Sequence, residues 1–233
     1  MSSTADCILS LDLDWAPDAA IDAVAELLID GGVPATWLVT HSSPAVDRLR
    51  ERAGLFELGI HPNFLPGSTH GSTTAEVLDH CMALVPDAVS MRTHALVQST
   101  PILSEVLERT PIRVDLSLFL PRTVGVEPLE YRWRGRSLVR IPYVWEDDVE
   151  LENGTLDAGF ASILGASGVK VFDFHPAHVF LNSSSMNAYR RVSGTLPHAD
   201  LTPHVEQGRG VGVVFRELIG AIAGRARHAR DFA

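Results

Sequence analysis

Hydrophobic residues alternate along this chain between two kinds of pattern. Short apolar runs bounded by turn-forming residues are typical of buried strands, and longer stretches with an apolar residue at every third or fourth position are typical of amphipathic helices. The first unit predicts a strand over residues 7–11 and a helix over residues 17–28. Pro17 suits the start of this helix, and Gly31 and Gly32 suit its end.

The same alternation continues through most of the chain and predicts an α/β fold with a parallel sheet. Between residues 129 and 144 the pattern changes to strand, turn at Gly135 and strand, which predicts an inserted β-hairpin. The pattern alone leaves open whether the sheet is doubly wound or forms a closed or distorted (β/α) barrel. The other predicted strands cover residues 35–39, 56–60, 88–91, 114–120 and 169–174, and the other predicted helices cover residues 45–52, 74–84, 103–108 and 213–225.

Composition is that of an ordinary globular protein. Of 233 residues, 45% are hydrophobic, and no Ser-, Pro- or Gly-rich linker divides them, so we expect one domain over residues 1–233. The 29 acidic residues outnumber the 19 basic ones, which gives a formal charge of -10 and makes nucleic acid and anionic membranes unlikely partners by charge repulsion. The basic residues Arg225, Arg227 and Arg230 are interpreted as cations in the last turn of the final helix.

Cysteine usage and hydropathy bear on the compartment. Cys7 and Cys81 are too few for a disulfide framework and form no CxxC pair, which fits a reducing environment. Residues 1–6 contain no basic patch followed by an apolar run, and no window approaches the ~20 apolar residues of a membrane span. We therefore expect a cytoplasmic protein.

Residues with chemical potential follow several predicted strands, where α/β folds gather their functional groups. Two of them, Asp12 and Asp14, lie two positions apart, so on an extended chain their carboxylates share one face. His61 and His70 are separated by a loop that can bring their imidazoles together, and two imidazoles with one carboxylate suit zinc with a position open for water. Taken singly, these residues could instead cap a helix or lie in solvent. Arg92 and His94 follow the fourth strand, and His175 and His178 follow the late one.

Several segments together resemble the polysaccharide deacetylase family, the NodB-like proteins of carbohydrate esterase family 4. The resemblance spans residues 8–182 and is closer to the branch found in bacterial surface-polysaccharide gene clusters. Two features depart from the family pattern: Leu13 separates the two aspartates, and Leu65 stands where the family has its second histidine, so that His70 must substitute. The segments that carry the resemblance are residues 12–15 (Asp-Leu-Asp-Trp), 32–40, 57–63, 91–94, 141–148 and 174–178.

This resemblance implies a distorted (β/α)7 barrel of the NodB-homology type. It also implies a divalent metal, with zinc as the first expectation and cobalt, nickel or manganese as alternatives, bound by Asp14, His61 and His70. The metal would activate a water molecule and polarise an amide carbonyl.

The hypothesis also assigns a catalytic base, a catalytic acid and the residues that support them. Asp12 is assigned as the base and His175 as the acid that protonates the leaving amine. Arg92 would keep the base ionised, and Asp148 or Asp147 would orient His175, although a structural ion pair and a solvated turn are alternative interpretations. The division between Asp12 and Asp14 stays open. Candidates for lining the substrate pocket are Asn63, His94, Trp15, Trp145 and His178.

The expected reaction is removal of an N-acetyl group from a small amino sugar or sugar conjugate. Two alternatives stay open. The same fold could hydrolyse a formamide, ureide or cyclic imide, or it could be a non-catalytic carbohydrate-binding relative, for which the missing His-x-x-x-His spacing argues.

Overall fold

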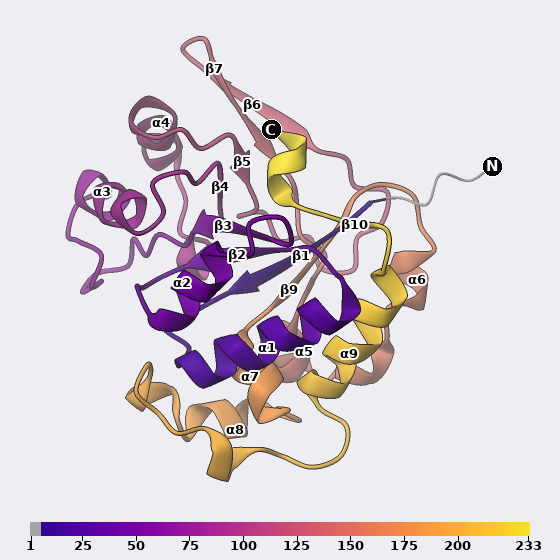
Figure 1. Ribbon diagram of the computed structural model, residues 1–233. Coiled ribbons are helices and arrows are strands. Elements are labelled where there is room, and N and C mark those ends of the chain that lie inside the picture. Colours follow the sequence, from indigo (N-terminus) through magenta and orange to yellow (C-terminus); the bar gives the residue numbers. More distant parts are fainter. Residues whose placement is uncertain (1–5) are drawn as a thin grey trace.

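The computed structural model describes residues 6–233 and has a curved central sheet surrounded by helices (Figure 1). The expectation that the N-terminus carries no leader falls mainly on residues 1–5, which lie outside the described residues. Along the sheet the strand order is β6-β7-β5-β4-β3-β2-β1-β9-β8, and β10 pairs with β1. The strands are β1 (Cys7–Asp12), β2 (Ala35–Val39), β3 (Phe56–Ile60), β4 (Ser90–Met91), β5 (Val114–Asp115), β6 (Leu129–Trp133), β7 (Arg136–Arg140), β8 (Trp145–Glu146), β9 (Lys170–Phe174) and β10 (Ala226–Arg227).

The two ends of this sheet are joined by one continuous segment of chain. Strand β7 pairs with β5, and β8, which follows β7 after four residues, pairs with β9. Between them, Tyr143 N–H donates to Leu118 O at 2.8 Å and Val144 N–H donates to Val171 O at 2.9 Å. The sheet therefore curves back on itself, and the distorted (β/α) barrel expected from the sequence is confirmed.

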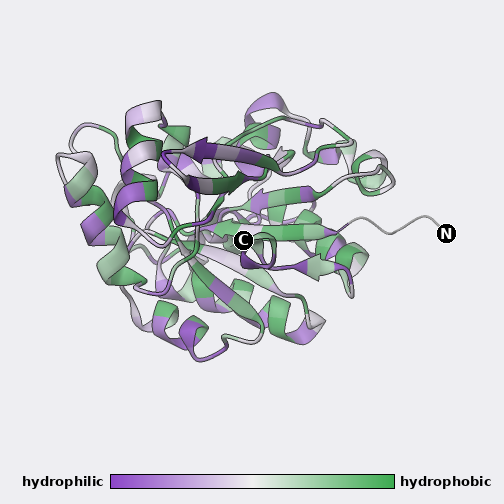
Figure 2. Ribbon diagram, turned by 90° about the horizontal axis from the view of Figure 1, so that it is seen from above, coloured by the Kyte–Doolittle hydropathy of each residue, from purple (hydrophilic) through white to green (hydrophobic). Residues whose placement is uncertain are grey.

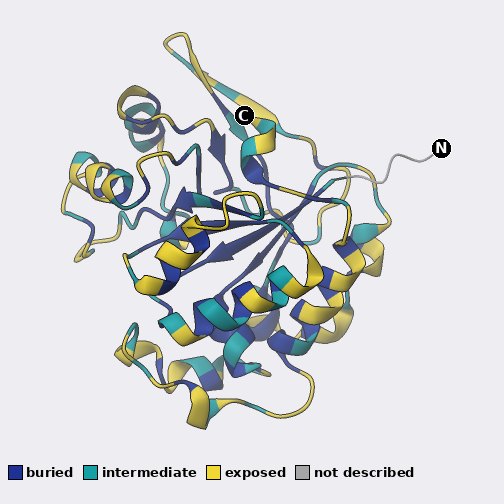
Figure 3. Ribbon diagram, viewed as in Figure 1, coloured by how far each residue is buried: buried dark blue, intermediate teal, exposed yellow. Residues whose placement is uncertain are grey.

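Helices cover the outside of the sheet. Helices α1, α7 and α9 pack against one another on one side, and α3 and α4 pack together on another (Figure 1). Apart from the β6–β7 hairpin, the strands are largely buried, whereas the helices expose their outer faces (Figure 3). Apolar residues concentrate on the buried strands and on the inward faces of the helices (Figure 2). The α-helices are α1 (Asp18–Gly31), α2 (Pro44–Arg50), α3 (Thr74–Leu84), α4 (Thr100–Arg109), α5 (Asp147–Asn153), α6 (Ala161–Leu164), α7 (Pro176–Leu181), α8 (Met186–Arg190) and α9 (Val211–Ile222).

Several predicted elements are observed with the same bounds, including β2, β3 and α3. Local signals explain the accuracy at α3, since the Thr73 side chain accepts from Glu76 N and the Glu76 side chain accepts from Thr73 N in a capping box. The inserted hairpin is also confirmed. Its turn has positive φ at Arg134 (47°) and Gly135 (78°), as a two-residue hairpin turn of type I′ requires.

The interpretation of the basic tail is wrong. Helix α9 ends at Ile222, so the arginines that follow lie outside its last turn. Arg227 belongs to β10, which pairs with β1, and Arg230 N–H donates to Glu57 Oε2 at 3.0 Å. These residues attach the C-terminal segment to the barrel.

Two further features of the described residues are the state of the cysteines and the apolar character of the helices. Cys7 and Cys81 are both buried and form no disulfide. Within residues 6–233, none of the helices combines the length and the apolar character that crossing a membrane requires.

Candidate metal and catalytic site

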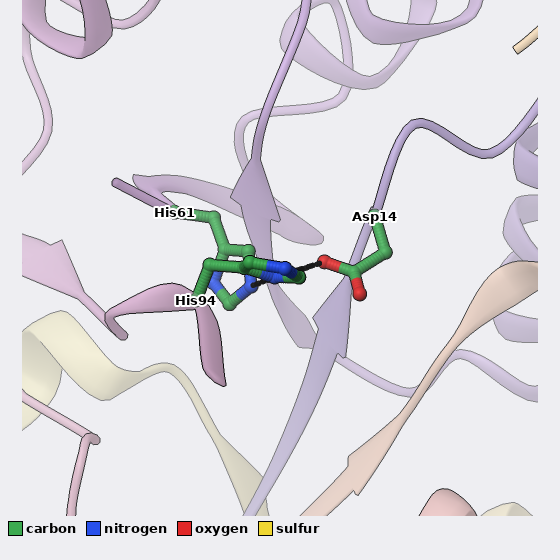
Figure 4. A group of neighbouring side chains, drawn as sticks. All are labelled: Asp14, His61 and His94. Carbon is green, nitrogen blue, oxygen red and sulfur yellow. Dashed lines mark hydrogen bonds and ion pairs between the residues drawn. The ribbon is translucent and has the colours of Figure 1, made fainter. Parts of the chain in front are cut away.

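Asp14, His61 and His94 meet at the carboxyl end of the sheet (Figure 4). Asp14 Oδ1 lies 3.1 Å from His61 Nε2 and 3.0 Å from His94 Nδ1, and the two imidazole nitrogens are 3.3 Å apart. One carboxylate oxygen and two ring nitrogens therefore form a nearly regular triangle.

Each of the three side chains is placed by the end of a strand. His61 follows β3 directly, and His94 begins a short 3₁₀ turn three residues after β4. Strand β1 ends at Asp12, and Asp14 lies in the turn that follows, with a left-handed backbone (φ 41°). Asp12 and Asp14 do converge as expected, but the turn brings them together rather than an extended strand.

The donor atoms fit a divalent cation. A tetrahedral zinc site with metal–ligand distances of about 2.0–2.1 Å separates neighbouring donors by about 3.3 Å, close to the observed spacing. The buried His61 Nδ1 has no hydrogen-bond partner among the described residues, so Nε2 is the ring nitrogen through which His61 contacts the group. Asp14, His61 and His94 could hold the metal, and a fourth position would face the cavity.

His70 does not join this group. Its Nε2 lies 2.8 Å from Thr40 O, and its Nδ1 lies 3.2 Å from Asn63 N and 3.4 Å from Cys81 Sγ. Burial lowers the pKa of His70 to about 4, which keeps the imidazole neutral. Because both ring nitrogens are engaged, we replace His70 by His94 in the candidate ligand set.

A second carboxylate, Asp12, lies beside the triangle with a buried arginine behind it. Asp12 Oδ2 is 3.6 Å from His61 Nε2, and Arg92 Nη1 donates to Asp12 Oδ1 at 2.8 Å. Arg92 is 1% exposed and also donates to Asp173 Oδ1 and, at 2.9 Å, to Ser10 Oγ. The expected Arg92–Asp12 contact is thus present, and Asp173 is a further partner in it.

On the opposite side, His175 is held by Asp147. The His175 backbone N–H donates to Asp147 Oδ2 at 2.8 Å, and its Nδ1 lies 2.7 Å from Asp147 Oδ1. This contact leaves Nε2 directed at Asp14 Oδ2, 3.8 Å away. Of the two acidic candidates, Asp147 makes the direct contact. Asp148 lies 3.8 Å from His175 Nδ1, and its Oδ1 contacts His178 Nε2 at 2.6 Å.

Electrostatic interactions with their neighbours favour opposite charges on Asp14 and His175. Burial opposes ionisation of Asp14, but contacts with His61 and His94 hold its pKa well below the usual value. Burial likewise opposes charge on His175, yet the neighbouring Asp148 and Asp147 raise its pKa well above 6.5. This shift favours the protonated imidazole, the form that an acid catalyst needs.

The site opens into a cavity of about 160 Å³, which we call the inner cavity. Asp12, Asp14, His94 and His175 all line it, so the candidate base, ligands and acid reach one space. The full lining is Asp12, Asp14, His61, Arg92, Thr93, His94, Ala95, Leu96, Tyr143, Glu146, Asp148 and His175.

The other expected substrate residues differ in their access to this space. Trp15 is half-buried and its ring centroid lies 5.4 Å from that of His94. Trp145 is 1% exposed and packs against Phe174, so it belongs to the core. Asn63 Oδ1 accepts from Leu65 N at 2.9 Å and shapes the loop.

Three residues in or behind the cavity were missed from the sequence. Tyr143 hydroxyl donates to Glu146 Oε2 at 3.2 Å, and burial raises the pKa of Glu146 to about 7. Asp173 carried a usable signal, because an ionisable residue within a buried strand needs a partner. Glu146 and Tyr143 lie within residues 141–148, a segment that carries the family resemblance, but no role was assigned to them there.

Comparison with known proteins identifies relatives of this chain. The family model described as WbmS-like polysaccharide deacetylase matches residues 9–193. A candidate polysaccharide deacetylase involved in O-antigen biosynthesis from Bordetella bronchiseptica is 36% identical, with a TM-score of 0.81 over 94% of this chain and 91% of that chain. Comparison with curated proteins gives no match.

More distant structures share the fold. The peptidoglycan N-acetylglucosamine deacetylase Bc1960 is 12% identical, with a TM-score of 0.52 over 98% of this chain and 87% of that one. The 4-alpha-glucanotransferase of Thermococcus litoralis is 10% identical, with a TM-score of 0.51 over 97% of this chain and 37% of that one. The family match and the 36% identical relative together show that this chain belongs to the WbmS-like polysaccharide deacetylases.

Proposed function

We propose that this protein is a metal-dependent N-deacetylase that removes an acyl group from an amino sugar. The observation that supports this most is the triangle of Asp14, His61 and His94, which has a carboxylate, Asp12, on one side and an imidazole, His175, on the other. Family membership supports deacetylation, and the Bordetella relative supports a carbohydrate substrate.

Asp14, His61 and His94 would hold the metal, with zinc as the first candidate. When bound, such a cation acidifies a water molecule and polarises the amide carbonyl. Asp14 contributes a carboxylate oxygen, and His61 and His94 contribute ring nitrogens, a set of donors that suits zinc.

Asp12 is placed to remove the proton of the attacking water. Its Oδ1 is engaged by Arg92, so Oδ2 is the oxygen that accepts the proton. The contact with Arg92 holds the carboxylate in place, with Oδ2 on the side of His61.

His175 is placed to protonate the leaving amine. Cleavage of an amide needs a neutral amine as leaving group, and His175 Nε2 faces the cavity with its other nitrogen held by Asp147. The proton moves from Nε2 to the amide nitrogen, and the paired aspartates stabilise the imidazolium before transfer.

Chelation tests the metal requirement. Protein treated with a chelator should lose hydrolysis of N-acetylated hexosamines, measured as released acetate, and zinc or cobalt should restore it. Full activity in metal-stripped protein would contradict the proposal. Protein that binds metal and sugar but releases no acetate would favour a non-catalytic carbohydrate-binding relative.

Substitution separates the two aspartates. Asp12→Asn should lower kcat by about 10²–10⁴-fold, the range of a general base, and retain the metal. Asp14→Asn should lower metal content itself, measured by elemental analysis. The reverse pattern would exchange the two roles.

A further inference from the structure

A second cavity, which we call the outer cavity, lies beside the inner one. Its volume is about 210 Å³, and it shares Asp14 and His94 with the inner cavity. The candidate metal group therefore forms the boundary between two spaces. The outer cavity is lined by Asp14, Trp15, His94, Tyr189, Ser193 and Leu196.

Trp15 is fixed as one wall of the outer cavity. Its backbone is left-handed (φ 55°), and its N–H donates to Thr40 Oγ1 at 3.1 Å. The ring contacts two imidazoles, with its centroid 5.4 Å from those of His70 and His94. His70 thus has a role in the site as a support for Trp15, although it is not placed as a ligand.

Tyr189 contributes a second aromatic wall from α8. Its ring centroid lies 4.6 Å from that of His178, whose Nε2 contacts Asp148. The ring is therefore supported by the same group of residues that surrounds His175. Burial raises the pKa of Tyr189 to about 12, so its hydroxyl stays protonated and can donate.

Hydrogen-bonding groups in this space lack protein partners. Among the described residues, no hydrogen bond is made by the Trp15 indole N–H, the Tyr189 hydroxyl or the Ser193 hydroxyl. Two aromatic surfaces with a few convergent donors are typical of pockets that bind a ring with apolar faces and polar edges. A pyranose has this character, because its C–H groups form the faces and its hydroxyls form the edges.

We propose that the outer cavity binds the sugar ring of the substrate between Trp15 and Tyr189, with the amide at the Asp14–His94 boundary and the acyl group in the inner cavity. This inference rests on the proposed deacetylase function and adds the direction in which the substrate lies. The smaller inner cavity contains the base, the acid and the candidate ligands, which leaves room for the amide and a small acyl group. The ring then belongs in the larger outer cavity.

A comparison of three N-acetylated sugars with one ring-less amide tests this placement. The probes are N-acetylglucosamine, N-acetylgalactosamine and N-acetylmannosamine, with N-(2-hydroxyethyl)acetamide as an amide that keeps a neighbouring hydroxyl but has no ring. The readout is the ratio of kcat/KM for the most active sugar to kcat/KM for the ring-less amide, using the zinc-loaded full chain. The wild-type ratio should exceed 10.

Substitutions then locate the preference. Trp15→Ala and Tyr189→Ala should each lower the ratio about tenfold, equal to about 1.4 kcal/mol of selectivity, mainly through a higher KM for the sugar. Trp15→Phe and Tyr189→Phe retain an aromatic face and should recover most of the ratio. Trp133→Phe, in the hairpin far along the sheet, is the matched aromatic control and should leave the ratio unchanged.

The outcomes distinguish this inference from the proposed function. A wild-type ratio near one, or ratios in Trp15→Ala and Tyr189→Ala equal to that of the wild type, would overturn the sugar placement while the deacetylase proposal stands. Hydrolysis of none of the amides by the zinc-loaded protein would overturn both. Metal content and thermal unfolding of each variant identify a substitution that acts through misfolding, and in that case Trp15→Leu and Tyr189→Leu, which keep side-chain volume without an aromatic face, replace the alanine variants with the same expected fall in the ratio.

Discussion

Replacement of Arg92 by methionine tests the account of the buried charges. Arg92 is 1% exposed and lies between Asp12 and Asp173, and its guanidinium carbon is 4.3 Å from the centre of the Tyr143 ring. Methionine keeps much of the side-chain volume but removes the charge and all five donors. The two aspartates would then face each other in the barrel without a cation.

The expected loss of stability follows from breaking a buried ion pair on one side. Such changes cost about 3–5 kcal/mol, because the remaining carboxylates are left buried and uncompensated. For a chain of this size, each kcal/mol lowers Tm by about 2–4 °C, so the variant should melt roughly 6–20 °C below the wild type. Ser10 Oγ and Leu116 O would also lose their guanidinium contacts, at 2.9 and 3.1 Å.

This loss should depend on pH in a defined direction. Burial and the neighbouring Asp12 already raise the pKa of Asp173 well above 3.8, although Arg92 lowers it, and removal of Arg92 should raise it further. A carboxyl whose pKa is higher in the folded state binds a proton more tightly there. The stability it contributes is fully present below the unfolded pKa and is lost as pH rises through the folded pKa. The difference between wild type and Arg92→Met should therefore be smaller at pH 5 than at pH 8.

Urea unfolding at both pH values provides the assay, and an exposed arginine provides the control. Arg109 is 41% exposed and pairs with the exposed Asp79 at 2.9 Å, so Arg109→Met should change the free energy of unfolding by less than about 1 kcal/mol. A loss below 1 kcal/mol for Arg92→Met, or an equal loss at pH 5 and pH 8, would refute the reasoning. Adding Asp173→Asn to Arg92→Met should restore part of the stability, since one buried negative charge is removed.

Further predictions concern the metal and the acid. His94→Ala should weaken metal binding by more than about 100-fold, because loss of a ligand exceeds the 10–100-fold cost of losing an outer-shell partner; isothermal titration with zinc measures it. His70→Ala should change the affinity for the metal by no more than a few-fold. It should lower the free energy of unfolding by about 1–3 kcal/mol, since Thr40 O and Asn63 N lose a buried partner. A greater loss of metal affinity than in His94→Ala would reinstate His70 as the ligand. Asp147→Asn should lower the pKa of His175, so the alkaline limb of the pH–rate profile should move to lower pH; an unmoved limb would remove His175 from the role of acid.

Local signals in the sequence were sufficient for most strands and helices but not for barrel closure. Strands β2 and β3 are continuous apolar runs between turn residues, so their bounds could be predicted. Closure depends on Tyr143 and Val144, whose hydrogen bonds to Leu118 and Val171 join segments far apart in the chain. The segment around Pro142 has little strand character of its own, and only tertiary register shows that it completes the barrel.

The site was largely predictable because functional groups collect at strand ends in α/β folds. That rule identified Asp12, His61, Arg92 and His175, which all line the inner cavity. It could not separate Asp147 from Asp148, because adjacent residues differ only in the direction of their side chains. In the structure, the start of α5 at Asp147 fixes these directions.

The placement of Asp14 and His94 explains why the third ligand that we propose differs from the one that motif spacing suggested. Four non-glycine residues around the site, Asp14, Trp15, Ala95 and Leu96, have φ values between 41° and 55°, a conformation that costs about 1–2 kcal/mol per residue. They form two pairs, one after β1 and one after β4, and tertiary contacts hold both pairs. Trp15 N–H donates to Thr40 Oγ1, and the N–H of His94 donates to Pro62 O at 3.0 Å.

Neither pair contains the glycine or asparagine that usually marks a left-handed turn. The turns after β1 and β4 could therefore not be predicted from these residue types. Asp14, in its left-handed turn, places Oδ1 3.0 Å from His94 Nδ1, while the ring nitrogens of His70 contact Thr40 and Asn63. The proposed replacement of His70 by His94 as the third ligand therefore depends on tertiary contacts, and histidine spacing alone does not contain that information.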